Sequence, residues 1–168
     1  MNAMSDHALA AELGRLLRAR GFRIATAESC TGGLVAAAIT SVPGSSEWFE
    51  RGFVTYSNDA KAELLGVPRE TIAANGAVSE PVARAMAEGA VAHSRAQCAL
   101  SITGIAGPDG GTDDKPVGRV CFGWAFPGEP AVTTTKRFDG ARQAVREAAA
   151  RAAMQGFVDI LGARTAPD

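Results

Sequence analysis

The chain has 168 residues, of which 46% are hydrophobic and 21% are charged, and its formal net charge is −1. This composition is typical of a globular protein, and the length suits one well-packed core, so we expect a single domain over residues 1–168. A net charge near zero argues against a nucleic-acid partner, and no apolar run approaches the roughly 20 residues that cross a bilayer, so no membrane partner is expected either.

Hydrophobic spacing and turn residues predict helices that alternate with strands and then a late hairpin. In chain order the expected elements are a helix over 6–20, a strand over 22–27, a helix over 32–41, a strand over 49–56, helices over 59–65 and 68–74, a longer helix behind Ser79, strands over 98–103, 117–126 and 131–138, and a helix over 140–161. This order predicts an α/β fold, specifically a three-layer α/β/α sandwich with a mixed, mostly parallel sheet.

The cysteines and histidines exclude some kinds of site. Cys30, Cys98 and Cys121 are scattered and odd in number, which favours reduced thiols and a cytoplasmic location. His7 and His93 each fall on a predicted helix, and no group of residues has metal-ligand spacing, so no metal site is expected. A Ser-His-Asp triad would have to recruit one of these two histidines.

Polar or glycine-rich loops follow three of the predicted strands, at 28–33, 56–61 and 103–112. Ligands of open α/β sheets bind beyond the carboxyl ends of the strands. The first loop places Ser29, Thr31, Gly32 and Gly33 where a strand becomes a helix. Helix-start amides suit an anion or a developing oxyanion, and glycines let a substrate approach them. The alternative is that the hydroxyls only cap the helix.

The second loop contains Tyr56, Asn58 and Lys61. If Asn58 is the N-cap, Lys61 lies in the first helical turn, where the helix dipole disfavours an ammonium group. Its pKa should then be lowered, especially if it is partly buried, and a neutral lysine can serve as a general base for a serine. Tyr56 could relay or donate a proton. The alternative is a solvated lysine and a tyrosine on an edge strand.

The third loop has four glycines between Gly104 and Gly111, and its N–H groups could bind a phosphate, although it matches neither the P-loop nor the G-x-G-x-x-G pattern. Arg142 and Arg146 lie four residues apart on the last helix, so either one could hold an anion. The alternatives are a mobile connection and a solvated helix face.

Several of these motifs occur together and in order. They are Ala27-Glu28-Ser29-Cys30-Thr31-Gly32-Gly33, Val54-Thr55-Tyr56-Ser57-Asn58 with Lys61, Ala77-Val78-Ser79-Glu80, and Thr103 to Thr112 with Lys115-Pro116-Val117-Gly118. Over about residues 6–162 the chain resembles the CinA carboxy-terminal domain family, the nicotinamide-nucleotide amidohydrolases. One departure is Gly140-Ala141-Arg142, where the family often has Gly-Asp-Arg.

The resemblance implies hydrolysis of the amide of nicotinamide mononucleotide (NMN) to nicotinate mononucleotide and ammonia. It implies Ser29 as nucleophile, Lys61 as base and Tyr56 as an assisting group, without a metal or a cofactor. It also implies a homo-oligomer, which we expect to be a dimer. The expected substrate-binding residues are Thr31, Gly32, Gly33, Thr103, Gly104, Gly107 and Arg142.

Three alternatives remain open from the sequence. Cys30 is a rival nucleophile, because a thiolate is intrinsically a better attacking group. The chain could be a non-catalytic nucleotide-binding module with the same fold. It could also be a serine amidase for another, unphosphorylated amide.

Overall fold

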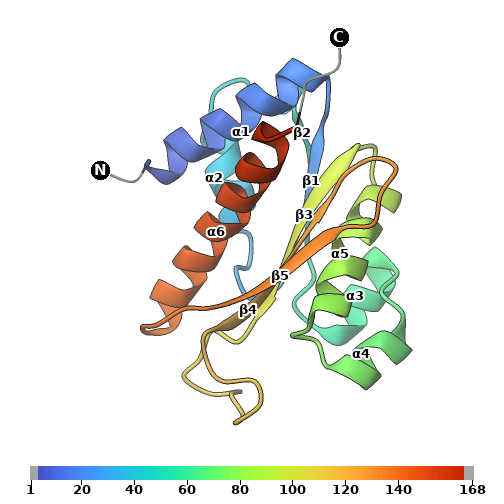
Figure 1. Ribbon diagram of the computed structural model, residues 1–168, viewed down its shortest axis with the longest axis vertical. Coiled ribbons are helices and arrows are strands. Elements are labelled where there is room, and N and C mark those ends of the chain that lie inside the picture. Colours follow the sequence, from blue (N-terminus) through green and yellow to red (C-terminus); the bar gives the residue numbers. More distant parts are fainter. Residues whose placement is uncertain (1–3, 165–168) are drawn as a thin grey trace.

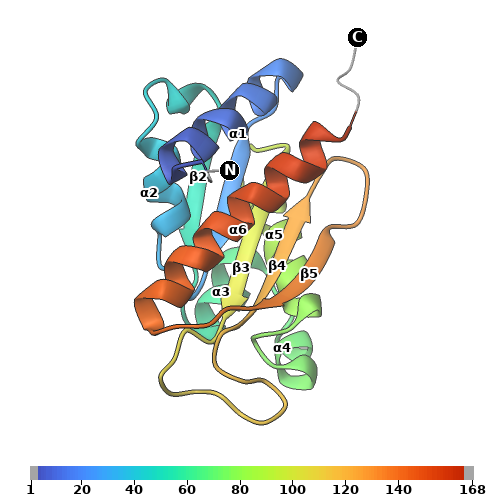
Figure 2. The ribbon, with the colours of Figure 1, turned by 60° about the vertical axis from the view of Figure 1, so that its left-hand side comes forward.

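The computed structural model describes residues 4–164, in which five strands form one sheet between two layers of helices (Figures 1 and 2). The helices are α1 (Asp6–Arg20), α2 (Leu34–Thr40), the 3₁₀ helix η1 (Ser45–Glu47), α3 (Asn58–Leu65), α4 (Arg69–Asn75), α5 (Glu80–Ala92) and α6 (Arg142–Gly162). The strands are β1 (Ile24–Glu28), β2 (Phe49–Val54), β3 (Cys98–Gly104), β4 (Arg119–Ala125) and β5 (Val132–Arg137). The predicted three-layer α/β/α fold is confirmed.

The sheet has the strand order β2-β1-β3-β4-β5. β1 pairs in parallel with β2 and with β3, whereas β4 is antiparallel to both β3 and β5. The sheet is therefore mixed, as predicted. "Mostly parallel" holds for strand direction, because only β4 runs against the others within the described residues, but it does not hold for the pairings, which divide evenly. The short turn between β4 and β5 can only join antiparallel strands.

The order of the strands in the sheet indicates where a ligand site would lie. The chain moves from β1 through α2 to β2, and then returns through α3, α4 and α5 to β3 on the other side of β1. Because parallel crossovers are right-handed, this reversal puts α2 and α5 on opposite faces. α1 and α6 pack on the face of α2, and α3 and α4 lie with α5 (Figure 1). The strand order reverses between β1 and β3, which is where such sheets bind ligands.

Local sequence explains the element boundaries well. The Ser5 hydroxyl caps α1 by accepting a hydrogen bond from the Ala8 N–H, and Gly21 ends the helix in the left-handed conformation at φ 65°. Every residue of β1 is buried because helices cover both faces of the sheet there.

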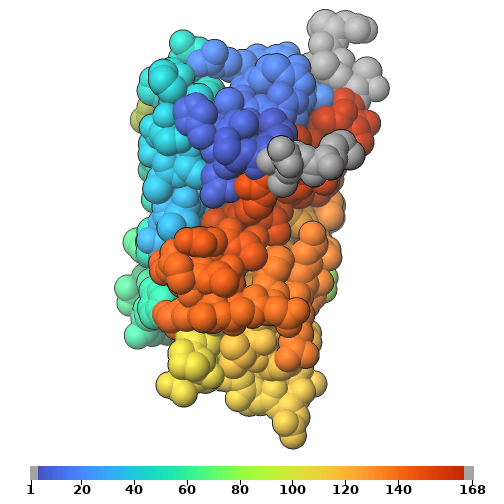
Figure 3. Space-filling view, turned by 90° about the vertical axis from the view of Figure 1, so that its left-hand side faces the viewer, coloured from blue at the N-terminus to red at the C-terminus, as the bar shows by residue number. Residues whose placement is uncertain are grey.

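One face of the molecule carries α1, α2 and α6, and the loop after β3 protrudes below α6 (Figure 3). None of the helices among residues 4–164 is long and apolar enough to span a membrane.

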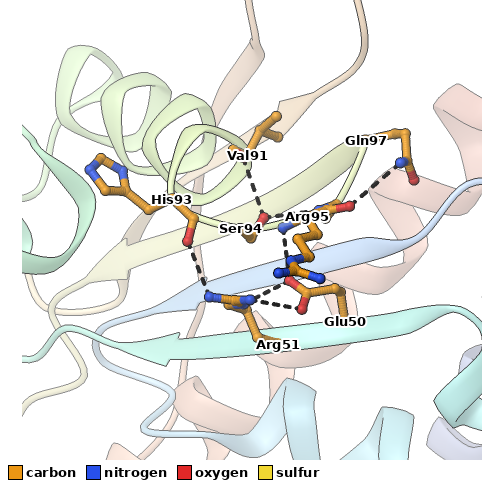
Figure 4. Close-up of polar contacts among 8 residues, drawn as sticks. Glu50, Arg51, Val91, His93, Ser94, Arg95 and Gln97 are labelled. Atoms are coloured by element: carbon orange, nitrogen blue, oxygen red, sulfur yellow. Dashed lines mark hydrogen bonds and ion pairs between the residues drawn. The ribbon is translucent and has the colours of Figure 1, made fainter.

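A polar network ties the edge strand β2 to the connection between α5 and β3 at the opposite end of the sheet from the carboxyl ends of β1 and β3 (Figure 4). The carboxylate of Glu50 accepts hydrogen bonds from the Arg51 guanidinium at 2.7 and 3.0 Å and from the Arg95 N–H at 3.0 Å. Arg51 also donates to the His93 carbonyl at 3.4 Å. The hydrogen bonds from Arg51 lower the pKa of Glu50.

Glu50→Gln is expected to lower the free energy of unfolding by about 1 kcal/mol at pH 7, without changing activity, because it removes one charged partner of this network. Since the pKa of Glu50 is lowered in the folded state, its contribution is present at neutral pH and is lost as pH falls through that lowered pKa. Urea denaturation of the wild type and of Glu50→Gln, from neutral pH down to acidic pH, should show that the difference in the free energy of unfolding becomes smaller in acid. An equal difference at every pH would contradict this account, and Glu63→Gln, on the exposed surface of α3, is the control.

Candidate active site

The predicted loops converge on one cavity of about 260 Å³ at the carboxyl ends of β1, β2 and β3. Its lining is Ser29, Cys30, Tyr56, Asn58, Lys61, Ala77, Val78, Thr103, Gly104, Ile105, Ala106, Gly107, Asp109, Gly110 and Arg142. The three catalytic candidates, Ser29, Lys61 and Tyr56, all line this cavity, and so do Thr103, Gly104, Gly107 and Arg142. The topology therefore brings together residues that are more than 100 positions apart.

Ser29 and Lys61 are in direct contact. The Lys61 Nζ lies 3.0 Å from the Ser29 Oγ, and both residues are buried, Lys61 to 1% exposure. The same nitrogen lies 3.0 Å from the Thr55 carbonyl oxygen and 3.2 Å from the Tyr56 carbonyl oxygen. Burial of the ammonium lowers the pKa of Lys61.

The three partners of Nζ define what a neutral Lys61 can do. Two of them are carbonyl oxygens, which only accept hydrogen bonds. A neutral amine has two N–H groups and one lone pair, so its two N–H groups go to these carbonyls. The lone pair then faces Ser29, the one partner of the three that can donate a proton. This arrangement suits proton transfer from Ser29 to Lys61.

The helix that carries Lys61 starts one residue earlier than the sequence predicted. Ser57, rather than Asn58, is the N-cap of α3, and its hydroxyl accepts a hydrogen bond from the Ala60 N–H at 3.0 Å. Lys61 is thus one position further into the helix than expected. Burial rather than the helix dipole is the main cause of its lowered pKa.

The turn after Ser29 differs from the expected anion site. The helix α2 begins at Leu34, and its first-turn N–H groups at Val35 and Ala36 donate to the buried carboxylate of Glu28 at 3.0 and 3.1 Å. Glu28 also accepts a hydrogen bond from the Thr31 hydroxyl at 2.6 Å. These helix-start amides are therefore occupied by a side chain of the protein. Sequence reasoning missed this role of Glu28.

Three of the expected substrate-binding residues do not line the cavity. Thr31 is fully buried and its hydroxyl faces Glu28. Gly32 and Gly33 have φ angles of 57° and 108°, so they form the left-handed turn that leads into α2. They form the backbone path between Ser29 and α2.

The glycine-rich loop supplies free donors instead. In the part of the chain that the structure describes, the backbone N–H groups of Ala106, Gly107, Asp109 and Gly110 donate to no protein acceptor, and all four residues line the cavity. Gly107 has a φ of 83°, which favours glycine. These N–H groups are available to an anionic group of a ligand.

Arg142 and Arg146 have different surroundings, although they are one helical turn apart. Arg142 lines the cavity and donates to the Gly107 carbonyl at 2.8 Å and to the Tyr56 hydroxyl at 3.1 Å. Arg146 does not line it, and its guanidinium binds the carbonyls of Cys30 and Thr31. Of the two, Arg142 is the one that can meet a ligand anion.

The rival nucleophile is poorly placed for ionisation. Cys30 lines the cavity, but burial raises the pKa of its thiol to about 11. The histidines lie elsewhere: His7 contacts the Ser41 hydroxyl and the His93 ring contacts the Gly89 carbonyl. No cluster of His, Cys, Asp or Glu within residues 4–164 could hold a metal ion.

Thr103 is hydrogen-bonded to the Ala77-Val78-Ser79-Glu80 segment, to which the sequence analysis gave no function. Its hydroxyl donates to the Ala77 carbonyl at 2.9 Å, and Ala77 and Val78 line the cavity. Glu80 of the same motif binds Thr133 and Thr135 of β5 at 2.8 and 2.7 Å. The Ala77-Val78-Ser79-Glu80 motif therefore joins one cavity wall to the far edge of the sheet.

Comparison with known proteins shows the family of this chain. The family description of the CinA C-terminal domain matches residues 6–161. The chain belongs to the CinA C-terminal domain family. This CinA domain is 55% identical over 147 residues to the nicotinamide-nucleotide amidohydrolase PncC of Escherichia coli K12, covering 88% of this chain and 89% of that protein.

Two further relatives show the range of the family. A CinA-like protein of Syntrophobacter fumaroxidans is 51% identical over 154 residues, which cover 92% of this CinA domain but only 36% of that longer protein. The crystal structure of competence damage-inducible protein A from Klebsiella pneumoniae superposes with a TM-score of 0.92 at 39% identity, covering 96% of this chain and 100% of that chain.

Proposed function

We propose that this protein hydrolyses the carboxamide of NMN to nicotinate mononucleotide and ammonia, with Ser29 as nucleophile and Lys61 as base. The observation that carries the proposal is the 3.0 Å contact between the Lys61 Nζ and the Ser29 Oγ inside the cavity. The substrate class comes from the similarity to the Escherichia coli nicotinamide-nucleotide amidohydrolase.

The chemistry proceeds in two halves. Neutral Lys61 takes the hydroxyl proton of Ser29 as Oγ attacks the carboxamide carbon, and N–H groups of the glycine-rich loop can stabilise the oxyanion. Lys61 then returns the proton to the leaving nitrogen, and ammonia departs from a Ser29 ester. In the second half Lys61 takes a proton from water, the hydroxide attacks the ester, and the proton returns to Ser29 as the acid is released.

Arg142 is the residue that we expect to bind the phosphate group of NMN. One terminal nitrogen of Arg142 donates to the Gly107 carbonyl of the glycine-rich loop and the other to the Tyr56 hydroxyl. These two contacts orient the guanidinium so that it can bind the phosphate of the substrate. The hydroxyl of Tyr56 thus contacts Arg142, and the backbone carbonyl of Tyr56 contacts Lys61. We assign Tyr56 an assisting role at both ends of the cavity.

NMN is expected to be hydrolysed with a kcat/KM roughly 10- to 150-fold higher than nicotinamide riboside, which lacks the phosphate, because a charge-assisted contact contributes about 1.5–3 kcal/mol. The measurement is ammonia release from both compounds side by side. Arg142→Met should remove most of this preference by raising the KM for NMN while changing riboside hydrolysis little.

The same assay separates the competing functions. Equal kcat/KM values for the two compounds would favour an amidase for unphosphorylated amides. Binding of NMN without ammonia release would favour a non-catalytic nucleotide-binding module. Ammonia release from NMN with a clear phosphate preference supports the proposed activity.

A further inference from the structure

The short turn that carries Ser29 is held from two sides by charged groups. Five residues, 29–33, connect the end of β1 to the start of α2. On one side the Glu28 carboxylate accepts hydrogen bonds from the Thr31 hydroxyl and from two α2 amides. On the other side Arg146, which reaches across from α6, donates to the backbone carbonyls of the turn.

All three guanidinium nitrogens of Arg146 are engaged. Nε donates to the Cys30 carbonyl at 3.0 Å, Nη2 to the Thr31 carbonyl at 3.4 Å, and Nη1 to the Gln143 side chain at 2.8 Å. Gln143 lies on the same helix, so it fixes the orientation of the planar group. A Cβ atom on Gly32 would lie 3.3 Å from Nη2, so the turn passes directly beneath the guanidinium.

Arg146 therefore holds the peptide units Cys30–Thr31 and Thr31–Gly32, which begin one residue after Ser29. Cys30 and Thr31 are buried. The Thr31 carbonyl also accepts a hydrogen bond from the Leu34 N–H at 3.1 Å, whereas within residues 4–164 the Cys30 carbonyl has Arg146 as its one donor. Without Arg146 the buried Cys30 carbonyl would lose its donor and carry a desolvation cost, which would drive the turn to rearrange. Such a rearrangement would move Ser29, whose Oγ must stay within about 2.6–3.2 Å of Lys61 for proton transfer.

We propose that Arg146 is a positioning residue for the nucleophile, acting through the turn at 30–31 and not through the substrate. This inference rests on the proposed function, because it assigns Arg146 a role in the reactivity of Ser29. It predicts that loss of Arg146 lowers kcat and leaves KM nearly unchanged. Arg142, one helical turn away, should show the opposite pattern because it lines the cavity.

The test compares Arg146→Met, Arg146→Lys and Arg142→Met, with Arg151→Met on the outer part of α6 as a control. For Arg146→Met we expect kcat for NMN to fall about 10- to 100-fold with KM within about twofold, because a displacement near 1 Å can cost about 100-fold. Lysine should restore part of the rate by donating to one carbonyl. The control Arg151→Met removes an ion pair with Asp6 and should leave kcat and KM unchanged.

Two outcomes of these kinetic measurements would overturn the inference. One is a lower melting temperature for Arg146→Met with unchanged kcat per folded molecule, which would make the contact purely structural. The other is a raised KM like that of Arg142→Met, which would place Arg146 on the substrate.

A second readout separates this inference from the proposed substrate. A fluorophosphonate probe labels an activated serine whatever its natural substrate, so slower labelling of Ser29 in Arg146→Met supports the positioning role even if NMN is not hydrolysed. Labelling at the wild-type rate would reject it. A wild-type protein that neither hydrolyses NMN nor reacts with the probe would reject both proposals.

Discussion

Ser29→Ala is expected to lower kcat for NMN hydrolysis by about 1,000-fold or more, because removal of a nucleophile takes away the covalent route entirely. Among residues 4–164, the Ser29 hydroxyl is the only side-chain group that forms a hydrogen bond with the Lys61 Nζ, and it lines the cavity. The measurement is ammonia release under saturating NMN. Calorimetric titration with NMN and thermal melting check that the variant still binds substrate and folds.

Cys30→Ala is the matched control for that experiment. With the pKa of the thiol raised to about 11, only on the order of one molecule in a thousand carries a thiolate at pH 8. We therefore expect this variant to keep most of the wild-type rate. An inactive Cys30→Ala together with an active Ser29→Ala would transfer the nucleophile to the cysteine.

Lys61→Arg is expected to be nearly inactive, because a guanidinium keeps its proton at any pH at which the protein is folded. In the wild-type protein the rate should rise with pH through the lowered pKa of Lys61, since only the neutral amine accepts the Ser29 proton. The measurement is a pH profile of kcat, compared between wild type and variant.

A buried lysine can also support folding, so the Lys61 test needs a second variant. In Lys61→Ala, a small primary amine such as ethylamine added to the buffer should restore part of the rate if the base is what is missing. The restored rate should follow the titration of the added amine. An active Lys61→Arg, or a wild-type rate that falls as pH rises through the lowered pKa of Lys61, would reject Lys61 as the base.

The elements of this fold could be predicted well from local sequence. The helix α1 is delimited by Ser5 and Gly21, and its buried leucines recur at helical spacing. Prediction was weaker at the start of α3, because Ser57 and Asn58 are both competent N-caps and only the backbone path after β2 selects Ser57. At the start of α2, the glycines at 32 and 33 serve the turn instead of the helix.

The candidate site divides in the same way between local and tertiary information. Ser29, Lys61 and the glycine-rich loop were identifiable because unusual residue types follow strands, and ligand sites occur beyond strand ends. Which polar groups are already used inside the protein could not be predicted. The carboxylate of Glu28 takes the α2 amides, and Arg146 takes the carbonyls of the turn.

Hydrophobic spacing and local turn chemistry were enough to predict the layered α/β fold, the three loops of the site and the reactive residue types in those loops. The hydrogen-bond partners of each polar group, in contrast, follow from the tertiary structure. It made Lys61 a buried amine in contact with Ser29, and it separated Arg142 in the cavity from Arg146 on the turn. Burial and contacts between distant segments set these properties, since they depend on where the sheet order reverses between β1 and β3.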